Sequence, residues 1–281
     1  MLFFSQKKED VTMEGLLFTL NDRLSSSVYL EDKLDSLEEI YRLSISYPFS
    51  VGIHSLEYIL NSVEIKRPIQ YKILNNIFQS HDGDEFIDIS FKNENDIKNI
   101  LDNYINDIHY LSTINYLSKN ITKLSLIALK SDVFMQNIKN LTKINIIILI
   151  MLSKDNFFKE QIVVECILET ILNRIDILLD QKKEYERIKK TDKEQKTRKK
   201  VKINNIVIEK YINNTNLHNL ILLMIQIIKD SRKNHKYFIE LNFKRIIDKI
   251  LEYDKEIFFQ LLIVILNERS NNIKILQEYF M

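Results

Sequence analysis

The chain has 281 residues, of which 45% are hydrophobic and 28% are charged. This balance predicts a folded protein with a real core and excludes a chain that is disordered throughout. The formal net charge of +1 disfavours the strongly basic surface that general nucleic-acid binding requires.

Residue usage also favours helices and a reducing compartment. The sequence has three glycines and two prolines, too few for the many tight turns of a β-sheet protein, so we expect an all-α fold. The single cysteine, Cys166, excludes an internal disulfide and a multi-cysteine zinc site. The first residues, MLFF, are followed at once by charged residues, and the longest apolar run, residues 144–152, is too short to span a bilayer. We therefore expect a soluble, cytoplasmic protein whose membrane contacts are peripheral.

Apolar residues recur at helical spacing along most of the chain. Pro48 and Pro68 mark helix boundaries, and the polar residues 93–96 supply capping groups. Helices of about 10 to 16 residues are unstable alone in water, so they must pack on their neighbours. The spacing predicts such helices over residues 30–41, 53–63, 69–77, 97–108 and 111–121.

The spacing of these helices also predicts how they are arranged. Short connections favour antiparallel pairs, and one pair in roughly 40 residues is typical of HEAT and armadillo arrays. We expect an armadillo/HEAT-like, right-handed superhelical solenoid of stacked helix pairs, although no repeat is evident residue by residue. A globular helix bundle is the structural alternative.

Residues 81–85, HDGDE, form a short acidic segment between two of these helices. Three carboxylates around a glycine resemble the beginning of a calcium-binding loop. The remaining ligand spacing and the closing bidentate glutamate are missing, so a solvated loop is the preferred interpretation.

Positive charge is concentrated in one low-complexity segment, residues 182–202. It holds 11 of the 40 basic residues and 4 of the 39 acidic ones, so its formal charge is +7 and that of the other residues is −6. With so few apolar residues it cannot order itself fully, and it is a candidate contact for anionic lipid or an acidic partner. We expect armadillo-like head repeats over residues 1–181, a charged flexible insertion over 182–202, and further helical repeats with a C-terminal cap over 203–281.

The last part of the chain continues the helical pattern. Residues 217–228 are apolar nearly all round, which is typical of an inner helix of a stack. Further helices are expected over residues 239–253 and 257–266. Beyond them, the spacing of Ile273, Leu276 and Phe280 predicts an amphipathic turn that caps the array.

No combination of residues predicts catalysis, a metal site or a cofactor site. The glycines lie outside any phosphate-binding motif, and the five histidines show no metal-ligand spacing. Cys166 lies in an apolar helical sequence, where burial would make its thiol inert. Glu165 and Glu169 could share a helix face, for which a solvated surface is the plainer interpretation. We expect a binding protein, and an enzyme of unrecognised type is the least favoured class.

More specific features occur within residues 20–63. They are LNDRLSS at residues 20–26, the acidic pair Glu31 and Asp32, a helix that ends near Tyr47, and VGIHSLEYIL at residues 51–60. In this order they resemble the opening armadillo repeat of the general vesicular transport factor family, the long tethers that link transport vesicles to Golgi membranes. Later segments are similar to the same head domain, namely residues 71–80, 91–120 and the helix IVVECILETILN at 162–173, which lacks the family's acidic residue after Glu165.

This resemblance implies a vesicle-tethering scaffold for transport from the endoplasmic reticulum to the Golgi. The implied partners are a Rab-type GTPase, SNARE proteins and other Golgi tethering proteins, with a possible homodimer. The implied location is peripheral, at Golgi membranes and transport vesicles. Asp22, Arg23 and Glu165 are the candidate partner contacts, because they are polar residues of the two best-matching segments. Family members continue into a coiled-coil tail, whereas this sequence shows no sustained heptad array.

Two other functions stay open at this point. The first is a helical-repeat adaptor of another trafficking or transport pathway, which would share the architecture by analogy only. The second is a nucleic-acid binder that uses residues 182–202, which the acidic remainder of the chain disfavours.

Overall fold

The computed structural model describes residues 12–61, 68–103, 105–164, 167–194, 217–241 and 244–266, and every regular element in these ranges is a helix. The expected all-α helical-repeat fold is confirmed. Residue contacts divide the chain into two compact units, residues 1–119 and 120–281, which are described separately below.

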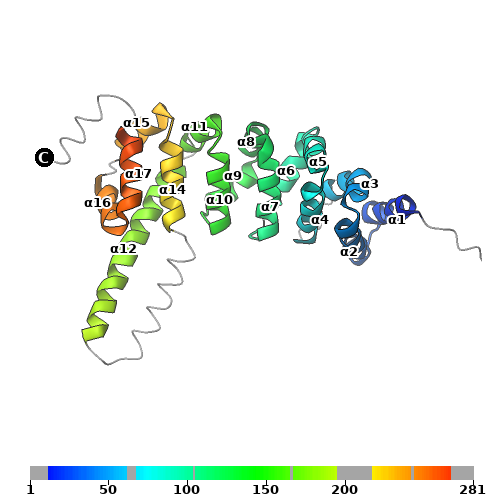
Figure 1. Ribbon diagram of the computed structural model, residues 1–281, viewed down its shortest axis with the longest axis horizontal. Helices are drawn as coiled ribbons and strands as arrows, with labels where there is room; N and C mark the ends of the chain where they lie inside the picture. The colour runs from blue at the N-terminus through cyan, green and yellow to red at the C-terminus, as the bar shows by residue number, and fades with distance from the viewer. Residues whose placement is uncertain are drawn as a thin grey trace, which may run out of the picture. The chain divides into compact units, whose positions relative to one another are not determined.

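Unit 1 begins with two long antiparallel hairpins and ends with three shorter helices (Figure 1). Helix α2 packs on α4 and α4 packs on α7, while α1 packs on α3 and α3 packs on α6. Helices α2, α4 and α7 therefore form one layer, and α1, α3 and α6 form another. The helices are α1 Met13–Ser26, α2 Leu30–Ser46, α3 Pro48–Asn61, α4 Pro68–Gln79, α5 Gly83–Ser90, α6 Glu94–Asp102 and α7 Ile108–Leu117.

Unit 2 shows the repeat most clearly, because equivalent helices of successive repeats pack on one another. Helix α11 contacts α8 and α15, α12 contacts α16, and α14 contacts α10 and α17. These contacts group the described helices of unit 2 in threes, as in a three-helix armadillo repeat, where the sequence predicted helix pairs. The helices are α8 Ile121–Leu129, α9 Asp132–Ile138, α10 Lys143–Leu152, α11 Asn156–Val164, α12 Ile167–Glu194, α14 Leu217–Ile228, α15 Arg232–Glu240, α16 Lys244–Tyr253 and α17 Lys255–Leu266.

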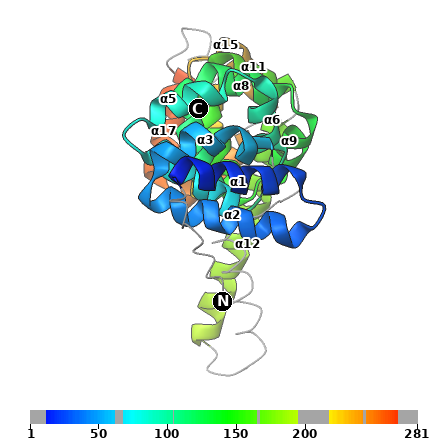
Figure 2. The same ribbon diagram turned by 90° about the vertical axis from the view of Figure 1, so that its right-hand side faces the viewer.

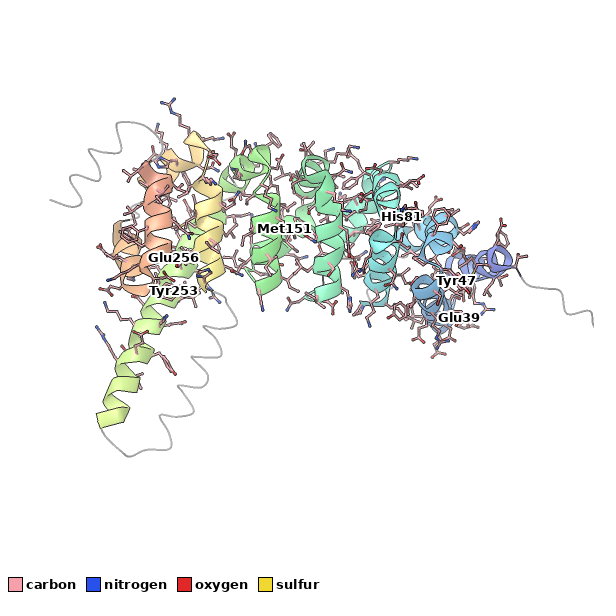
Figure 3. All side chains as sticks on the ribbon, in the orientation of Figure 1. Glu39, Tyr47, His81, Met151, Tyr253 and Glu256 are labelled. Carbon is pink, nitrogen blue, oxygen red and sulfur yellow. The ribbon has the colours of Figure 1, made fainter. Side chains whose placement is uncertain are left out.

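The cores of the two units consist of the apolar stripes of these helices, and side chains fill the spaces between them (Figure 3). Helix α14 buries residues on several of its faces, which confirms it as an inner helix. Some details of the expected pattern are wrong. The helices expected over residues 111–121 and 239–253 are not single helices, because α7 ends at Leu117 and α8 begins at Ile121, and α15 ends at Glu240 and α16 begins at Lys244. Ile53 is 55% exposed although it belongs to the expected apolar stripe of its helix. The single helix expected over residues 97–108 ends at Asp102, and α7 begins only at Ile108, where Asp107 caps it.

Polar side chains connect the stacked helices of unit 1. The amide of Asn76 on α4 donates to the hydroxyl of Ser44 on α2 at 2.9 Å, and the hydroxyl of Thr113 on α7 donates to the amide oxygen of Asn75 at 2.9 Å. Each bond joins one repeat to the next, so these half-buried groups have partners that are distant in sequence.

The acidic segment at residues 81–85 is mostly helical. His81 and Asp82 form a turn, and Gly83 already begins α5. A Cβ atom at Gly83 would lie 2.1 Å from the carbonyl oxygen of Phe78, so the close approach of the chain requires glycine here. Asp84 and Glu85 are exposed, as expected for a solvated segment, and Asp84 forms an ion pair with Lys119. The expectation of a loop is wrong, because residues 83–85 are helical.

The basic segment begins as helix. Helix α12 runs from Ile167 to Glu194 and so includes the first residues of the expected insertion. Figures 1 and 2 show its C-terminal half extending beyond α14 and α16. The flexible loop expected after it falls on residues 195–202, which lie outside the described residues. The division of the chain at residues 181 and 202 stays a prediction.

Candidate partner-binding surfaces

An apolar groove lies between three stacked helices of unit 2, α10, α14 and α17. Its volume is about 660 Å³, within the range of sites that bind small molecules or a few side chains. Five of its nine lining residues are apolar. The groove is lined by Ile150, Leu222, Ile225, Gln226, Lys229, Asp230, Gln260, Ile263 and Val264.

Helix α17 contributes an exposed apolar stripe beside this groove. Phe259, Ile263 and Leu266 are 58%, 57% and 45% exposed, and they recur at the spacing of one helical face. The opposite face is buried through Phe258 and Leu261, among others. Helix α17 is therefore apolar on both sides, and the side that faces solvent has no described partner helix.

The groove is bounded by a rigid turn at the end of α14. The side-chain amide of Gln226 donates to the carbonyl oxygen of Ser153 at 3.3 Å, which links α14 to the end of α10. Asp230 has a positive φ of 60°, a conformation that ends α14 sharply before Ser231 caps α15. These contacts fix the turn that carries Lys229 and Asp230.

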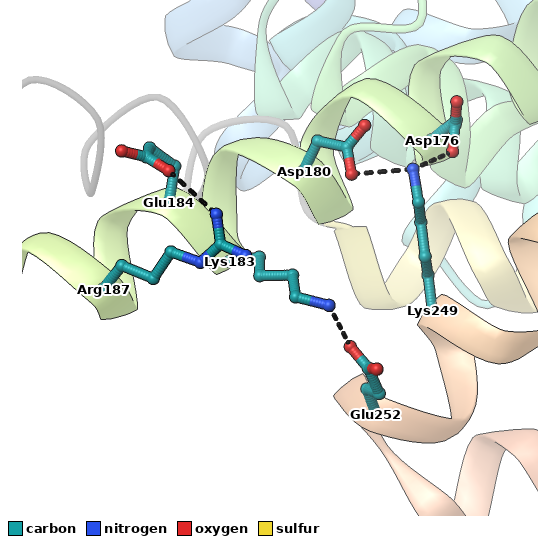
Figure 4. A network of polar contacts seen from close by, with 7 residues as sticks. All are labelled: Asp176, Asp180, Lys183, Glu184, Arg187, Lys249 and Glu252. Carbon is teal, nitrogen blue, oxygen red and sulfur yellow. Dashed lines mark hydrogen bonds and ion pairs between the residues drawn. The ribbon is translucent and has the colours of Figure 1, made fainter.

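A network of charged residues holds the projecting helix α12 against α16 (Figure 4). The ammonium group of Lys249 lies 2.5 Å from the carboxylate of Asp176 and 2.7 Å from that of Asp180. Burial opposes the charge of Lys249, but the hydrogen bonds and charges of the two aspartates outweigh it, so the pKa of Lys249 is raised. Farther along α12, Lys183 forms an exposed ion pair with Glu252 at 2.8 Å.

The same contact includes an aromatic residue. The ammonium group of Lys182 lies 4.0 Å from the centre of the Tyr253 ring, a cation–π geometry. The neighbouring cleft has a volume of about 70 Å³, too small for a typical ligand. These groups therefore serve to fix α12, and the described basic residues up to Arg187 are largely engaged with neighbours.

Unit 1 exposes apolar residues at its first hairpin. Val28 and Tyr29 in the connection between α1 and α2, and Leu30 at the beginning of α2, are 92%, 73% and 51% exposed. The hydroxyl of Ser27 accepts a hydrogen bond from the main-chain N–H of Tyr29 and donates one to the carboxylate of Asp32, which fixes this connection. Phe18 on α1 is also exposed.

Two of the three candidate contacts predicted from the sequence lie among the described residues. Asp22 and Arg23 are exposed on α1 of unit 1. Their main-chain carbonyl oxygens accept hydrogen bonds from Ser26 and Ser27 near the end of that helix. Glu165 and Cys166 lie outside the described residues.

Sequence reasoning missed the groove, although one signal for it was present. The apolar residues of α17 occupy more than one helical face, which is more than a helix with a single buried face needs. In the described part of the chain there is no group of three or more His, Cys, Asp or Glu side chains able to hold a metal ion. None of the described helices is long and apolar enough to span a bilayer.

These features are a groove and exposed apolar surfaces on stacked helices. The structure is similar to that of Uso1-2. The TM-score with the Uso1-2 crystal structure is 0.57 at 15% sequence identity, and the match covers 90% of this chain and 41% of Uso1-2. This chain thus spans less than half the length of Uso1-2, and the likeness shows a shared fold. No protein-family model matches the sequence, and no curated protein matches it.

Proposed function

We propose that this chain is a vesicle-tethering scaffold that acts in transport from the endoplasmic reticulum to the Golgi. The observation that carries the proposal is the likeness of the fold to that of Uso1-2 over 90% of the chain. The resemblance of residues 20–63 to the opening repeat of the general vesicular transport factors supports the same function independently. In this role the chain binds a Rab-type GTPase, SNARE proteins or other tether proteins and performs no chemistry.

The architecture suits such a role physically. A helical-repeat array presents a large surface whose shape is fixed before binding, so little conformational entropy is lost when a partner docks. The apolar groove of unit 2 and the exposed hairpin of unit 1 both offer large apolar side chains to a partner. Such side chains supply much of the binding energy in protein interfaces.

Localisation in the native cell is the first test. The tagged full-length chain should colocalise with a Golgi marker in juxtanuclear structures or puncta and should redistribute when export from the endoplasmic reticulum is blocked. A predominantly nuclear signal, or a diffuse signal that the block leaves unchanged, would refute the proposal.

Vesicle capture is the second test, and it also tests the candidate contacts Asp22 and Arg23. Immobilised full-length chain should retain vesicles that carry Rab and SNARE proteins. The double charge reversal Asp22→Lys with Arg23→Glu should reduce capture at least about tenfold, equivalent to one lost interface contact of about 1.4 kcal/mol. A matched control is Glu85→Lys with Lys92→Glu, which also preserves net charge on exposed residues of unit 1. Equal capture by both variants would exclude Asp22 and Arg23 as contacts, and no capture by the unmodified chain would contradict tethering.

A further inference from the structure

The first hairpin of unit 1 leaves one side of α2 without a described neighbour. Helix α2 packs on α1, α3 and α4 and buries residues such as Leu37 and Ile40. At its beginning, the adjacent residues Val28, Tyr29 and Leu30 are exposed. Three consecutive large apolar side chains leave apolar surface in water, so covering them with a partner is favourable.

This apolar tip, residues 28–30, has a fixed conformation. The main-chain N–H of Tyr29 donates to the hydroxyl of Ser27 at 3.2 Å, and that hydroxyl donates to the carboxylate of Asp32 at 3.0 Å. The main-chain N–H of Lys33 donates to the carbonyl oxygen of Tyr29 at 3.3 Å. Because the tip is already ordered, less conformational entropy is lost when a partner covers it.

Carboxylates follow the apolar tip along α2. Glu31, Asp35 and Glu38 are exposed and recur at i, i+4 and i+7, so they form one ridge of the helix, the acidic ridge. In the described part of the chain, none of these three carboxylates forms an ion pair. Helix α2 as a whole has five acidic and two basic residues, so its formal charge is −3.

The stability of α2 alone does not account for the acidic ridge. The helix dipole favours an acidic residue in the first turn, which explains Glu31. Asp35 and Glu38 lie beyond the first turn, and Asp35 is four residues from Glu31 and three from Glu38. Like charges at this spacing destabilise a helix. Lys or Arg side chains of a partner would relieve the repulsion, so the ridge is complementary to a cationic surface.

Negative charge beside apolar side chains selects the class of partner. The acidic ridge repels anionic lipid and nucleic acid. The described residues contain no group of three or more His, Cys, Asp or Glu side chains that could hold a metal ion. A protein segment that carries Lys and Arg beside apolar residues matches both features. Helix α2 has 17 residues and is about 25 Å long, so a partner helix of similar length can lie along it.

We propose that the apolar tip and the acidic ridge of α2 bind a basic amphipathic helix of a partner protein. Apolar residues of this partner cover Tyr29 and Leu30, and its Lys and Arg side chains pair with Glu31, Asp35 and Glu38. The charges speed association and act less at high salt, while the apolar tip supplies much of the binding free energy. Such binding does not require that the chain tethers vesicles.

Binding of a defined peptide to the full-length chain tests the charge complementarity. The probe is a fluorescent peptide of about 18 residues with Leu on one helical face and Lys on the other. Its affinity should fall at least about tenfold between about 50 mM and about 500 mM salt, and a peptide with Glu in place of Lys should not bind. The variant Asp35→Lys with Glu38→Lys should weaken binding at least about tenfold. The control, Glu85→Lys with Glu256→Lys, makes the same change in net charge at exposed positions on α5 and α17 and should bind as the unmodified chain does.

A second pair of variants locates the apolar contact. Val28→Ser with Tyr29→Ser should weaken peptide binding at least about tenfold. The matched control, Phe259→Ser with Ile263→Ser, also removes two exposed apolar side chains, but from the groove of unit 2, and should leave binding unchanged. Circular dichroism should show the same helix content in every variant. Binding that is lost in this control and kept in the variants of α2 and its apolar tip would place the peptide in the groove and overturn the proposal, as would no binding of the Lys peptide to the unmodified chain.

Sedimentation velocity distinguishes a partner protein from a second copy of the chain. The unmodified chain and the variant Asp35→Lys with Glu38→Lys should sediment as the same species. Self-association of the unmodified chain that this variant abolishes would overturn the proposal, because a second copy would then cover the acidic ridge.

Discussion

The ammonium group of Lys159 on α11 donates a hydrogen bond to the main-chain carbonyl oxygen of Lys229, 2.9 Å away at the end of α14. The last carbonyl groups of a helix lack intrahelical donors and carry partial negative charge, so a cation is favourable there. Asn234 on α15 adds two bonds, to the carbonyl oxygens of Lys159 and Ile227, each at 3.0 Å. These contacts join three helices of unit 2 through polar groups that are buried.

Replacing Lys159 separates the effect of its charge from that of its volume. Burial lowers the pKa of Lys159, and Asp230 and Asp155 offset this only in part. We expect Lys159→Met to change the free energy of unfolding by less than about 1 kcal/mol at neutral pH. The substitution removes a hydrogen bond, but it also removes the desolvation cost of a buried charge, and the two effects offset each other. Lys159→Ala should cost about 2–4 kcal/mol, because it leaves a cavity. Urea denaturation of both variants measures this, and equal losses would show that the bond, not the packing, dominates.

The lowered pKa of Lys159 also predicts a pH dependence. In the unfolded chain this lysine binds its proton more tightly than in the folded protein. Its contribution to the free energy of unfolding should therefore rise with pH between the lowered folded-state pKa and the ordinary value of 10.5. The difference between unmodified chain and Lys159→Met, measured across alkaline pH, isolates this effect. A difference that does not change with pH would contradict it.

Asp96 in unit 1 should make stability fall as pH rises, opposite to the effect of Lys159. Its carboxylate accepts a hydrogen bond from Asn93 at 2.8 Å, yet burial and then the charge of Glu57 raise the pKa of Asp96. The folded protein therefore holds this proton more tightly than the unfolded chain, and stability is lost as pH rises through the raised folded-state pKa. We expect Asp96→Asn to raise the free energy of unfolding by about 0.5–1 kcal/mol at neutral pH. The gain should shrink below the ordinary carboxyl pKa, and a loss of stability at neutral pH would contradict this account.

Replacing each of two helical glycines by alanine should affect stability differently. A Cβ atom at Gly52 on α3 would lie 2.5–2.7 Å from ring atoms of the buried Phe86, so Gly52→Ala must push α3 and α5 apart. We expect a loss of about 1–3 kcal/mol. Gly15 on α1 is exposed and its nearest contact would be 3.3 Å, to Thr12, so Gly15→Ala should be neutral or stabilise by up to about 1 kcal/mol. Thermal unfolding of the two variants should give midpoint shifts of opposite sign or clearly different size.

The ion pairs of Lys249 and of Lys183 between α12 and α16 should contribute differently to stability. Lys249→Met leaves Asp176 and Asp180 close together without their shared cation, in a site where the lysine side chain was only 16% exposed. We expect a loss of about 1–3 kcal/mol. Lys183→Met removes an ion pair whose partners are both about half exposed, and it should cost less than about 0.5 kcal/mol.

Denaturation at low and high salt measures both variants. The loss in Lys249→Met should persist at high salt, because partly buried charges are screened less than exposed ones. If the two substitutions were equally costly, or if salt abolished both effects, the Asp176–Lys249–Asp180 cluster would not anchor α12.

The sequence by itself determined the helices and the class of fold. Apolar residues spaced for one helical face predicted most helices of unit 1 and, in unit 2, helices α14 and α17, and the all-round apolar character of residues 217–228 predicted the inner position of α14. This succeeds because helical periodicity is a local property, set by the 3.6-residue turn of the chain. The scarcity of glycine and proline excluded sheet structure for the same local reason.

Only the tertiary structure decided which faces are covered and which polar groups are paired. Ile53 fits an apolar stripe in the sequence but stays exposed, because no described neighbour covers that position of α3. Lys159 finds its partner 70 residues away at Lys229, and the groove is assembled from helices α10, α14 and α17, which are separated along the chain. Burial depends on which distant helices meet, and that information is carried by the packing of the whole repeat array rather than by any local window of residues.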